Sequence, residues 1–260
     1  ASVSPPLPFA TPRTRFNRAL TSSRSFATAT LALDRVRAVK DAFGVTVNDV
    51  VLALTAGALR AFLSARGELP DRSLVAGVPV STGAPSEERR LSGNRVSNLI
   101  TSLRTDVADP VERLKAIHEV MKAAKGVHTI LGPEMLQDWV EYTPPRPYAA
   151  IVRLYSKLRI GSRVPPPLNL VVSNVPGPTD ALYVAGARLA SIYSVGPILE
   201  GIGLNLTAWS YLGRLNFGAI ASPDALSDED LHEITERLGD ALAELEKRAA
   251  GAGTNLTKTS

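Results

Sequence analysis

The order of helix-type and strand-type hydrophobic patterns is the feature that most limits how this chain can fold. Residues 25–33 and 74–80 carry strand patterns, and between them residues 46–66 carry one apolar stripe at helical spacing, formed by Val47, Val50, Val51, Leu54 and Ala58. More strand patterns and a long helix follow. Because the two types are interleaved without strict alternation, we predict an α/β fold in which helices flank a layered, mixed β-sheet.

Turn and capping residues set the limits of the other elements. Two helices are predicted to end before a glycine: Asp34 to Phe43, followed by Gly44, and Thr46 to Arg66, followed by Gly67. A third helix begins at Asp109-Pro110 and runs to about Gly126. Two further helices are predicted at 133–141 and 147–160, and a last helix is capped by Ser227 and Asp230. The other predicted strands are 94–104, 168–174, one or two within 182–194, and a hairpin of 202–210 and 214–221.

Proline and glycine positions suggest how the chain is organised. Residues 1–23 hold Pro5, Pro6 and Pro8 among threonines and serines, so we predict an extended linker from a preceding segment. Residues 24–250 are predicted to form one domain and 251–260 a flexible tail. No apolar run is long enough for a membrane span, since the richest, Val50 to Leu59, has ten residues.

Composition excludes several kinds of site. The chain of 260 residues has no cysteine, so a disulfide framework, a thiolate metal site and a thiol nucleophile are all excluded. Aromatic residues make up 5% and do not interleave with basic residues, which argues against nucleic-acid binding. The three histidines, His118, His128 and His232, stand apart in sequence and are predicted to be isolated surface residues, and we expect no metal or cofactor.

Basic charge is concentrated in two segments. Residues 1–40 carry seven basic groups and one acid, and residues 142–179 carry five basic groups and no acid. In the second segment Arg146, Arg153 and Lys157 fall on one face of a predicted helix, opposite apolar residues. Such a face suits anionic lipid or a phosphate-bearing ligand, and an ordinary solvated surface is the alternative.

Three segments resemble one family when they are taken together and in order. They are Thr46-Val47-Asn48-Asp49-Val50-Val51, then Asn169-Leu170-Val171-Val172-Ser173-Asn174-Val175-Pro176-Gly177-Pro178, and the hairpin Gly203-Leu204-Asn205-Leu206-Thr207 with Gly213-Arg214-Leu215-Asn216-Phe217-Gly218. Over about residues 8–247 the chain is similar to the C-terminal half of the bacterial wax ester synthase/diacylglycerol acyltransferases, which include the mycobacterial triacylglycerol synthases.

The resemblance implies a fold, a reaction and a place for each substrate. The fold would be half of a structure like chloramphenicol acetyltransferase and the peptide-synthetase condensation domains, in which two α/β halves surround a tunnel. The reaction would be acyl transfer from acyl-CoA to diacylglycerol or a fatty alcohol. The implied catalytic histidine lies in an HHxxxDG motif of the N-terminal half, and that motif is absent from this chain. No catalytic residue is therefore predicted here.

Five polar residues in these segments are candidates for lining the tunnel. Asn48 and Asp49 open a helix, where a capping role is an equal alternative. Ser173 and Asn174 end a strand, and Asn205 interrupts an apolar one, where its amide needs partners. Asn205, Asn174 or Ser173 is a candidate donor to the oxyanion of the transition state. Arg146, Arg153 and Lys157 are candidates for contact with CoA or a membrane.

Two functions from different classes remain open at this point. The first is half of a cytoplasmic, peripherally membrane-associated enzyme that makes triacylglycerol or wax ester together with an N-terminal half, at a membrane or lipid-droplet surface. The second is a stand-alone module that binds lipid or CoA without catalysis. The absence of HHxxxDG is compatible with both.

Overall fold

A computed structural model of the chain describes residues 11–81, 96–131 and 166–256. The strands are β1 (Ser25–Ala32), β2 (Val75–Ser81), β3 (Val96–Ser102), β4 (Leu170–Val175), β5 (Tyr183–Val184), β6 (Ala187–Arg188), β7 (Leu204–Tyr211) and β8 (Arg214–Ala221). The helices are the short 3-10 helix η1 (Arg15–Asn17) and the α-helices α1 (Leu33–Phe43), α2 (Val47–Ala65), α3 (Pro110–Leu131) and α6 (Asp228–Leu256).

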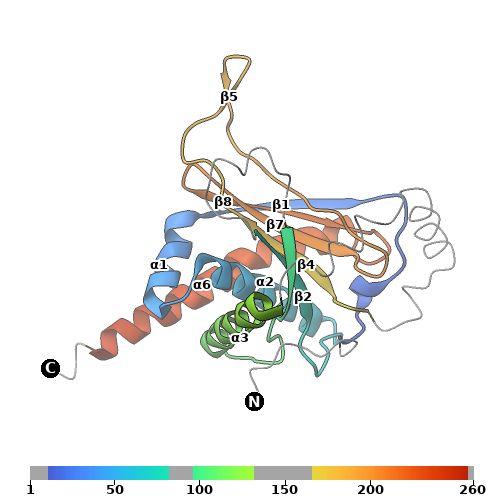
Figure 1. The fold of residues 1–260 in the computed structure, drawn as a ribbon, viewed down its shortest axis with the longest axis horizontal. Helices are drawn as coiled ribbons and strands as arrows, with labels where there is room; N and C mark the ends of the chain where they lie inside the picture. Colours follow the sequence, from blue (N-terminus) through green and yellow to red (C-terminus); the bar gives the residue numbers. More distant parts are fainter. Residues whose placement is uncertain (1–10, 82–95, 132–165, 257–260) are drawn as a thin grey trace.

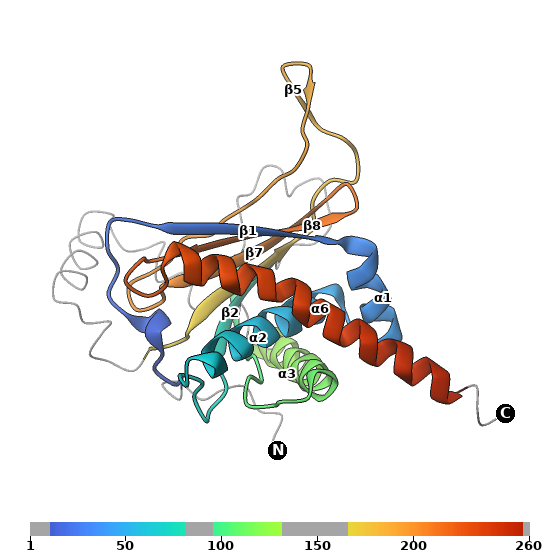
Figure 2. The same ribbon diagram turned by 180° about the vertical axis from the view of Figure 1, so that it is seen from behind.

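The described part is a two-layer α/β structure. Six strands form one sheet in the order β1-β8-β7-β4-β2-β3, while β5 and β6 form a separate hairpin. β7, β4 and β2 run parallel to one another, and the other neighbours in the sheet are antiparallel. All four α-helices lie on one face of the sheet (Figures 1 and 2). The predicted mixed sheet with flanking helices is confirmed.

The hydrophobic core lies between the sheet and α2. Nearly every residue of α2 from Asp49 to Leu63 is buried, because α2 packs against its neighbours α6 and α3 in the helix layer and against the sheet. Contrary to the expectation that no segment is long and apolar enough to span a membrane, α2 could cross one by length and composition, and in the fold 67% of that apolar window is buried. This burial is typical of a core helix.

Most predicted helix ends are confirmed. Thr46 caps α2 by accepting a hydrogen bond from the Asp49 N–H, and Gly44 ends α1 in the left-handed conformation with φ of 66°. Ser227 accepts from the Asp230 N–H at 3.1 Å, as the predicted capping box requires. Asp34 was the wrong choice of cap for α1, because the helix begins one residue earlier and its N-cap is Ala32.

The prediction of one or two strands within 182–194 is confirmed by β5 and β6, which have two residues each, and the chain after them is irregular. Two helix ends differ from the prediction. α3 continues past Gly126 to Leu131, and α6 continues into the predicted tail as far as Leu256. A glycine inside a helix, such as Gly126, lowers helix stability by only about 1 kcal/mol relative to alanine, and the other residues of α3 outweigh this loss. The predicted helices 133–141 and 147–160 lie outside the described residues.

The described part of the predicted linker, residues 11–23, packs against the domain. Phe16 is fully buried in the core, and the buried Asn17 donates hydrogen bonds to the Leu168 and Gly201 carbonyls at 3.0 and 2.8 Å. Asn169 is also fully buried, and its amide donates to the Pro12 carbonyl and to Asn17 Oδ1. This segment therefore belongs to the fold, which a reading of its proline and threonine content alone did not predict.

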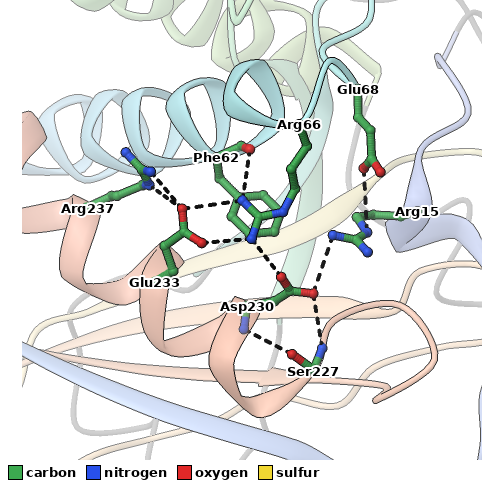
Figure 3. A network of polar contacts seen from close by, with 8 residues as sticks. All are labelled: Arg15, Phe62, Arg66, Glu68, Ser227, Asp230, Glu233 and Arg237. Atoms are coloured by element: carbon green, nitrogen blue, oxygen red, sulfur yellow. Dashed lines mark hydrogen bonds and ion pairs between the residues drawn. The ribbon is translucent and has the colours of Figure 1, made fainter.

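A network of charged side chains joins the end of α2 to the start of α6 (Figure 3). Arg66 stacks on the Phe62 ring and donates to Asp230 at 2.9 Å and to Glu233 at 2.8 Å. Arg15 lies within 3.4 Å of Asp230 and so connects η1 to the same network. Hydrogen bonds from Arg66 and Arg237 lower the pKa of Glu233 to about 2.

This network predicts a loss of stability in acid. Because the pKa of Glu233 is lowered in the fold, its contribution is complete above its ordinary value of 4.5 and disappears as the pH falls towards 2. Glu233 is partly exposed, so solvent screening limits the effect to about 1 kcal/mol. We expect Glu233→Gln to lower the free energy of unfolding by that amount in urea at pH 7 and by about a quarter of it near pH 2.5, where Glu233 is still partly ionised in the fold. Glu236→Gln, on the exposed side of α6, is the matched control, and equal losses in both variants would contradict the prediction.

Candidate functional site

One face of the sheet has no described helix on it, and we call it the open face. Strand alternation puts Leu204, Leu206 and Ala208 of β7 into the core and therefore turns Asn205, Thr207 and Trp209 to the open face. The pairing register brings residues of the neighbouring strands beside them on this face: Ser173 of β4, Asn216 and Gly218 of β8, and Thr28 and Thr30 of β1. The open face is thus polar along its centre.

An irregular segment, residues 189–199, crosses the open face, and we call it the strap. The Tyr193 hydroxyl lies 2.8 Å from Thr30 Oγ1, on β1. Farther along, the strap comes so close to the sheet that only glycine fits at two positions. A Cβ on Gly218 would lie 2.2 Å from the Ser194 carbonyl oxygen, and one on Gly196 would lie 2.4 Å from Asn205 Nδ2. These two glycines set the path of the strap.

Asn205 connects the strap to the sheet. It is 2% exposed; its Oδ1 accepts from the Gly196 N–H at 3.3 Å and from the Thr207 hydroxyl at 3.0 Å. Its Nδ2 donates to the Pro197 carbonyl at 3.4 Å. The sequence predicted that the buried Asn205 amide needs hydrogen-bond partners, and these are Gly196, Pro197 and Thr207 of the same chain. A direct role for Asn205 with substrate stays a prediction, and in this structure its side chain holds the strap.

Ser173 and Asn174 lie on opposite faces of the sheet. Ser173 pairs with Thr207 and shares the open face, whereas Asn174 pairs with Ala208 and shares the face that the helices cover. The turn after them is fixed on β7, because the Gly177 N–H donates to Ser210 Oγ at 3.0 Å. A Cβ at Gly177 would lie 2.4 Å from the Trp209 indole nitrogen, so glycine is required at this position.

Asn48 and Asp49 belong to the helix layer, away from the open face. Asp49 is 2% exposed, and its Oδ2 accepts from the Thr46 N–H at 2.9 Å and from the Thr46 hydroxyl at 2.8 Å. The predicted capping role is confirmed for Asp49. The five candidates therefore fall into two groups: Ser173 and Asn205 lie on the open face, and Asn48, Asp49 and Asn174 lie on the helix side.

His118 was predicted to be isolated, and that prediction is wrong. Its Nδ1 lies 2.7 Å from Asp49 Oδ2, although the two residues are 69 positions apart in sequence. Packing of α3 against α2 creates the contact, which no local sequence pattern indicates. His232 is exposed, with Nδ1 2.8 Å from the Asp228 carbonyl oxygen of its own helix. The side chain of His128 lies outside the described part of the chain.

The basic candidates Arg146, Arg153 and Lys157 also lie outside the described residues. Among the described residues, a surface depression of about 760 Å³ near η1 is lined by Arg13, Arg15 and Arg18 together with Glu68 and Asp224. Its charge is mixed, and Arg15 forms ion pairs with Glu68 and Asp230 (Figure 3). None of the candidate tunnel residues lines this depression.

The β5–β6 hairpin and the strap carry large apolar side chains in contact with solvent, which the sequence analysis did not single out. The hairpin projects away from the body of the domain (Figures 1 and 2). The exposed residues are Leu182, Tyr183, Val184, Tyr193, Val195 and Leu199, with exposed fractions from 41% to 66%, and Phe26 of β1 joins them at the open face with 48%. Exposed apolar side chains of this size are typical of surfaces that contact a protein, a membrane or a ligand.

Comparison with known proteins identifies the family of this chain. The model of the wax ester synthase/diacylglycerol acyltransferase (WS/DGAT) C-terminal domain matches residues 92–246, and that of the WS/DGAT catalytic domain matches residues 1–51. The chain belongs to the wax ester synthase/diacylglycerol acyltransferase family. A putative diacylglycerol O-acyltransferase of Mycobacterium tuberculosis H37Rv is 42% identical over 251 residues, which are 96% of this chain and 52% of the relative.

Other relatives and solved structures agree with this assignment. A second putative diacylglycerol O-acyltransferase of M. tuberculosis H37Rv is 39% identical, covering 92% of this chain and 46% of the relative. The structure of the wax ester synthase/diacylglycerol acyltransferase from Marinobacter aquaeolei VT8 superposes with a TM-score of 0.71 at 36% identity, covering 92% of this chain and 53% of that one. This chain of the WS/DGAT family thus spans about half the length of the curated relatives it matches.

More distant structures show the fold alone. A condensation domain of the enacyloxin polyketide synthase, which mediates chain release, matches with a TM-score of 0.54 at 15% identity. The epimerization domain of tyrocidine synthetase B matches with a TM-score of 0.56 at 11% identity. The predicted likeness to half of a condensation-type structure is confirmed.

Proposed function

We propose that this chain is the C-terminal half of an acyl-CoA-dependent O-acyltransferase that makes triacylglycerol or wax ester. The observation that carries the proposal is the 42% identity with a protein named a diacylglycerol O-acyltransferase, which extends over 96% of this chain and 52% of that relative. The catalytic histidine would come from the N-terminal half, since this chain has no HHxxxDG motif.

The proposed reaction needs a base, a hydrogen-bond donor to the oxyanion and a substrate path that is shielded from water. A histidine of the N-terminal half would remove the proton from the acceptor hydroxyl as its oxygen attacks the thioester carbonyl. The new C–O bond forms, the carbonyl oxygen becomes an oxyanion, and the C–S bond then breaks. The CoA thiolate takes the proton as it leaves. Ser173, on the open face, stays a candidate donor to the oxyanion, whereas Asn205 would first have to release the strap.

The partner proposed for the open face is the N-terminal half of the same enzyme. Two facts support it: the relatives are about twice as long as this chain, and the exposed apolar residues gather on the hairpin and the strap. Tyr183 and Val184 are 64% and 66% exposed, which is costly for side chains of this size unless a second body buries them. Burial of this surface would also keep water away from the thioester.

The substrates and the cellular place follow from the same proposal. Acyl-CoA would be the acyl donor, and diacylglycerol or a fatty alcohol the acceptor, with no resident cofactor. Because both acceptors are lipids, we propose a cytoplasmic enzyme that works at a membrane or lipid-droplet surface. Arg146, Arg153 and Lys157 are the residues proposed to contact anionic lipid or the CoA phosphates.

An acyl-transfer assay tests the proposed function. The chain joined to a WS/DGAT N-terminal half would be incubated with radiolabelled palmitoyl-CoA and either dioleoylglycerol or hexadecanol. We expect labelled triacylglycerol, labelled wax ester or both, and the ratio would identify the acceptor. Free fatty acid as the only labelled product would indicate a thioesterase. Intact acyl-CoA, in a preparation shown by circular dichroism to be folded, would overturn the proposal.

A further inference from the structure

Asn216 carries a buried hydrogen-bond donor on the open face. The residue is 0% exposed and pairs with Thr30 of β1 on one side and with Trp209 of β7 on the other. Its Oδ1 accepts from the Thr30 hydroxyl at 3.0 Å, which leaves Nδ2 as the donor of the amide. Nδ2 has no acceptor among the described residues. Because an unpaired buried donor lowers the stability of a fold, this amide calls for a partner from outside the described fold.

The strap encloses Asn216 against the sheet. The Tyr193 hydroxyl lies 2.8 Å from Thr30 Oγ1, which is beside Asn216 on the neighbouring strand. The Ser194 carbonyl oxygen lies over Gly218, the next residue of β8 on the same face. A ligand therefore reaches the amide when this part of the strap moves outward. The Tyr193 side chain is 41% exposed, so water can replace its hydrogen bond to Thr30 as the strap moves.

A second unpaired donor in the same row of the sheet is the indole N–H of Trp209. Its nitrogen also has no acceptor among the described residues. It lies against the turn after β4, since a Cβ on Gly177 would be 2.4 Å from Nε1. The backbone of this turn encloses the indole nitrogen, and Asn216 is thus the donor of this row that lies beneath the strap.

The surroundings of Asn216 on the open face are uncharged. Three successive rows across β1, β8, β7 and β4 hold only apolar, small or uncharged polar residues: Phe26, Ile220, Asn205 and Val171; Thr28, Gly218, Thr207 and Ser173; and Thr30, Asn216, Trp209 and Val175. Arg214, in the row beyond, is exposed at the start of β8. A phosphate or carboxylate would find no cation in these three rows. They suit a neutral ligand with an apolar chain and a carbonyl oxygen that accepts from an amide N–H.

We propose that Asn216 binds the carbonyl oxygen of a fatty acyl group and that the strap covers this site. The inference rests on the proposed function, in which the acyl-CoA thioester and the esters of diacylglycerol both carry such a carbonyl. It assigns a substrate contact to a residue for which the sequence analysis predicted no role.

NMR of the isotope-labelled chain tests the binding without any reaction. The side-chain amide signal of Asn216 should shift when S-octanoyl-N-acetylcysteamine or dihexanoylglycerol is added, and the larger shift identifies the thioester or the ester as the source of the carbonyl. Octanoate, which is charged, should cause no shift. If neither neutral probe shifts the signal, the amide serves a buried water only and the proposal is wrong. An equal shift with octanoate would also overturn it.

Two variants of the chain joined to its N-terminal half separate substrate binding from a structural role. Asn216→Asp removes the donor but keeps an acceptor for Thr30, and we expect it to lower kcat/KM for acyl-CoA about 30-fold. Thr30→Val removes the hydrogen bond to Oδ1 but keeps the donor, and it should lower kcat/KM less than about threefold. Equal losses in both variants would contradict the proposal, since Asn216 would then only hold Thr30.

The two experiments also distinguish this inference from the proposed function. If the unsubstituted joined protein forms no product, the proposed function fails, and the shift of the Asn216 signal still decides whether the open face binds an acyl carbonyl. The same shift decides the matter if Asn216→Asp does not fold, because it is measured on the unsubstituted chain.

Discussion

Replacing Asn169 by alanine is expected to lower the free energy of unfolding by about 4 kcal/mol. The Asn169 side chain accepts from the Val75 N–H at 2.8 Å and donates to the Pro12 carbonyl at 2.7 Å and to Asn17 at 2.9 Å. Asn169 is 0% exposed, so the variant would remove the side-chain partner of the Val75 N–H and of the Pro12 carbonyl inside the fold, while Asn17 Oδ1 would keep its hydrogen bonds from Thr14. Each such group costs about 1–3 kcal/mol. In a domain of this size, the loss corresponds to a fall in melting temperature of about 8–16 °C.

Thermal unfolding of the isolated chain, followed by circular dichroism, measures this effect. Asn174→Ala is the matched control, because Asn174 lies on β4, which begins directly after Asn169, and is only partly buried. We expect it to change the melting temperature by less than about 3 °C. If Asn169→Ala unfolds within about 2 °C of the unsubstituted chain, the Asn17–Asn169 contacts do not hold residues 11–19 to the sheet, and that part of our account is wrong.

The second large effect is expected from Gly218→Val. Valine suits a β-strand, so β8 itself should form, but the new Cβ would lie 2.2 Å from the Ser194 carbonyl oxygen. The strap must therefore move away from the open face. At an overpacking cost of about 2 kcal/mol, the displaced fraction of the strap should rise about thirtyfold. We expect proteolytic cleavage within residues 189–199 to accelerate by a similar factor.

Limited proteolysis with mass-spectrometric detection checks this prediction on the isolated chain. Gly239→Ala is the control, because no atom lies within 4 Å of a Cβ at that position of α6, and it should leave cleavage of the strap unchanged. In the chain joined to its N-terminal half, Gly218→Val should also reduce acyl transfer. A strap in Gly218→Val that resists proteolysis as well as the unsubstituted strap would show that close approach to β8 does not fix its path.

Local sequence patterns predicted the regular elements well because their causes are local. The apolar stripe of α2, the Thr46 cap, the Gly44 termination of α1 and the Ser227 capping box all depend on residues within one or two helical turns. The opposite orientation of Ser173 and Asn174 could also have been predicted from the sequence, since neighbouring residues of any strand point to opposite faces. We grouped them because they share a motif, and the fold separates them.

The features that could not be predicted depend on contacts between distant segments. Nothing near His118 in sequence indicates that a carboxylate will face it, because the contact arises only when α3 packs on α2. The strap has no periodic pattern, and the need for glycine at 196 and 218 appears only when the strap is laid over the sheet. Phe16 is buried beside Asn17 in sequence, and the side chain of Asn17 meets that of Asn169 across 152 positions of sequence.

The central claim is that this chain carries half of an acyltransferase site. The most direct test measures acyl transfer from labelled palmitoyl-CoA to dioleoylglycerol and to hexadecanol by the folded chain alone, beside the same chain joined to its N-terminal half. Our account predicts labelled lipid product from the joined protein and none above background from the chain alone, because the chain has no HHxxxDG histidine. Product formed by the chain alone at a rate comparable to that of the joined protein would contradict the account, since a complete catalytic site would then lie within these 260 residues.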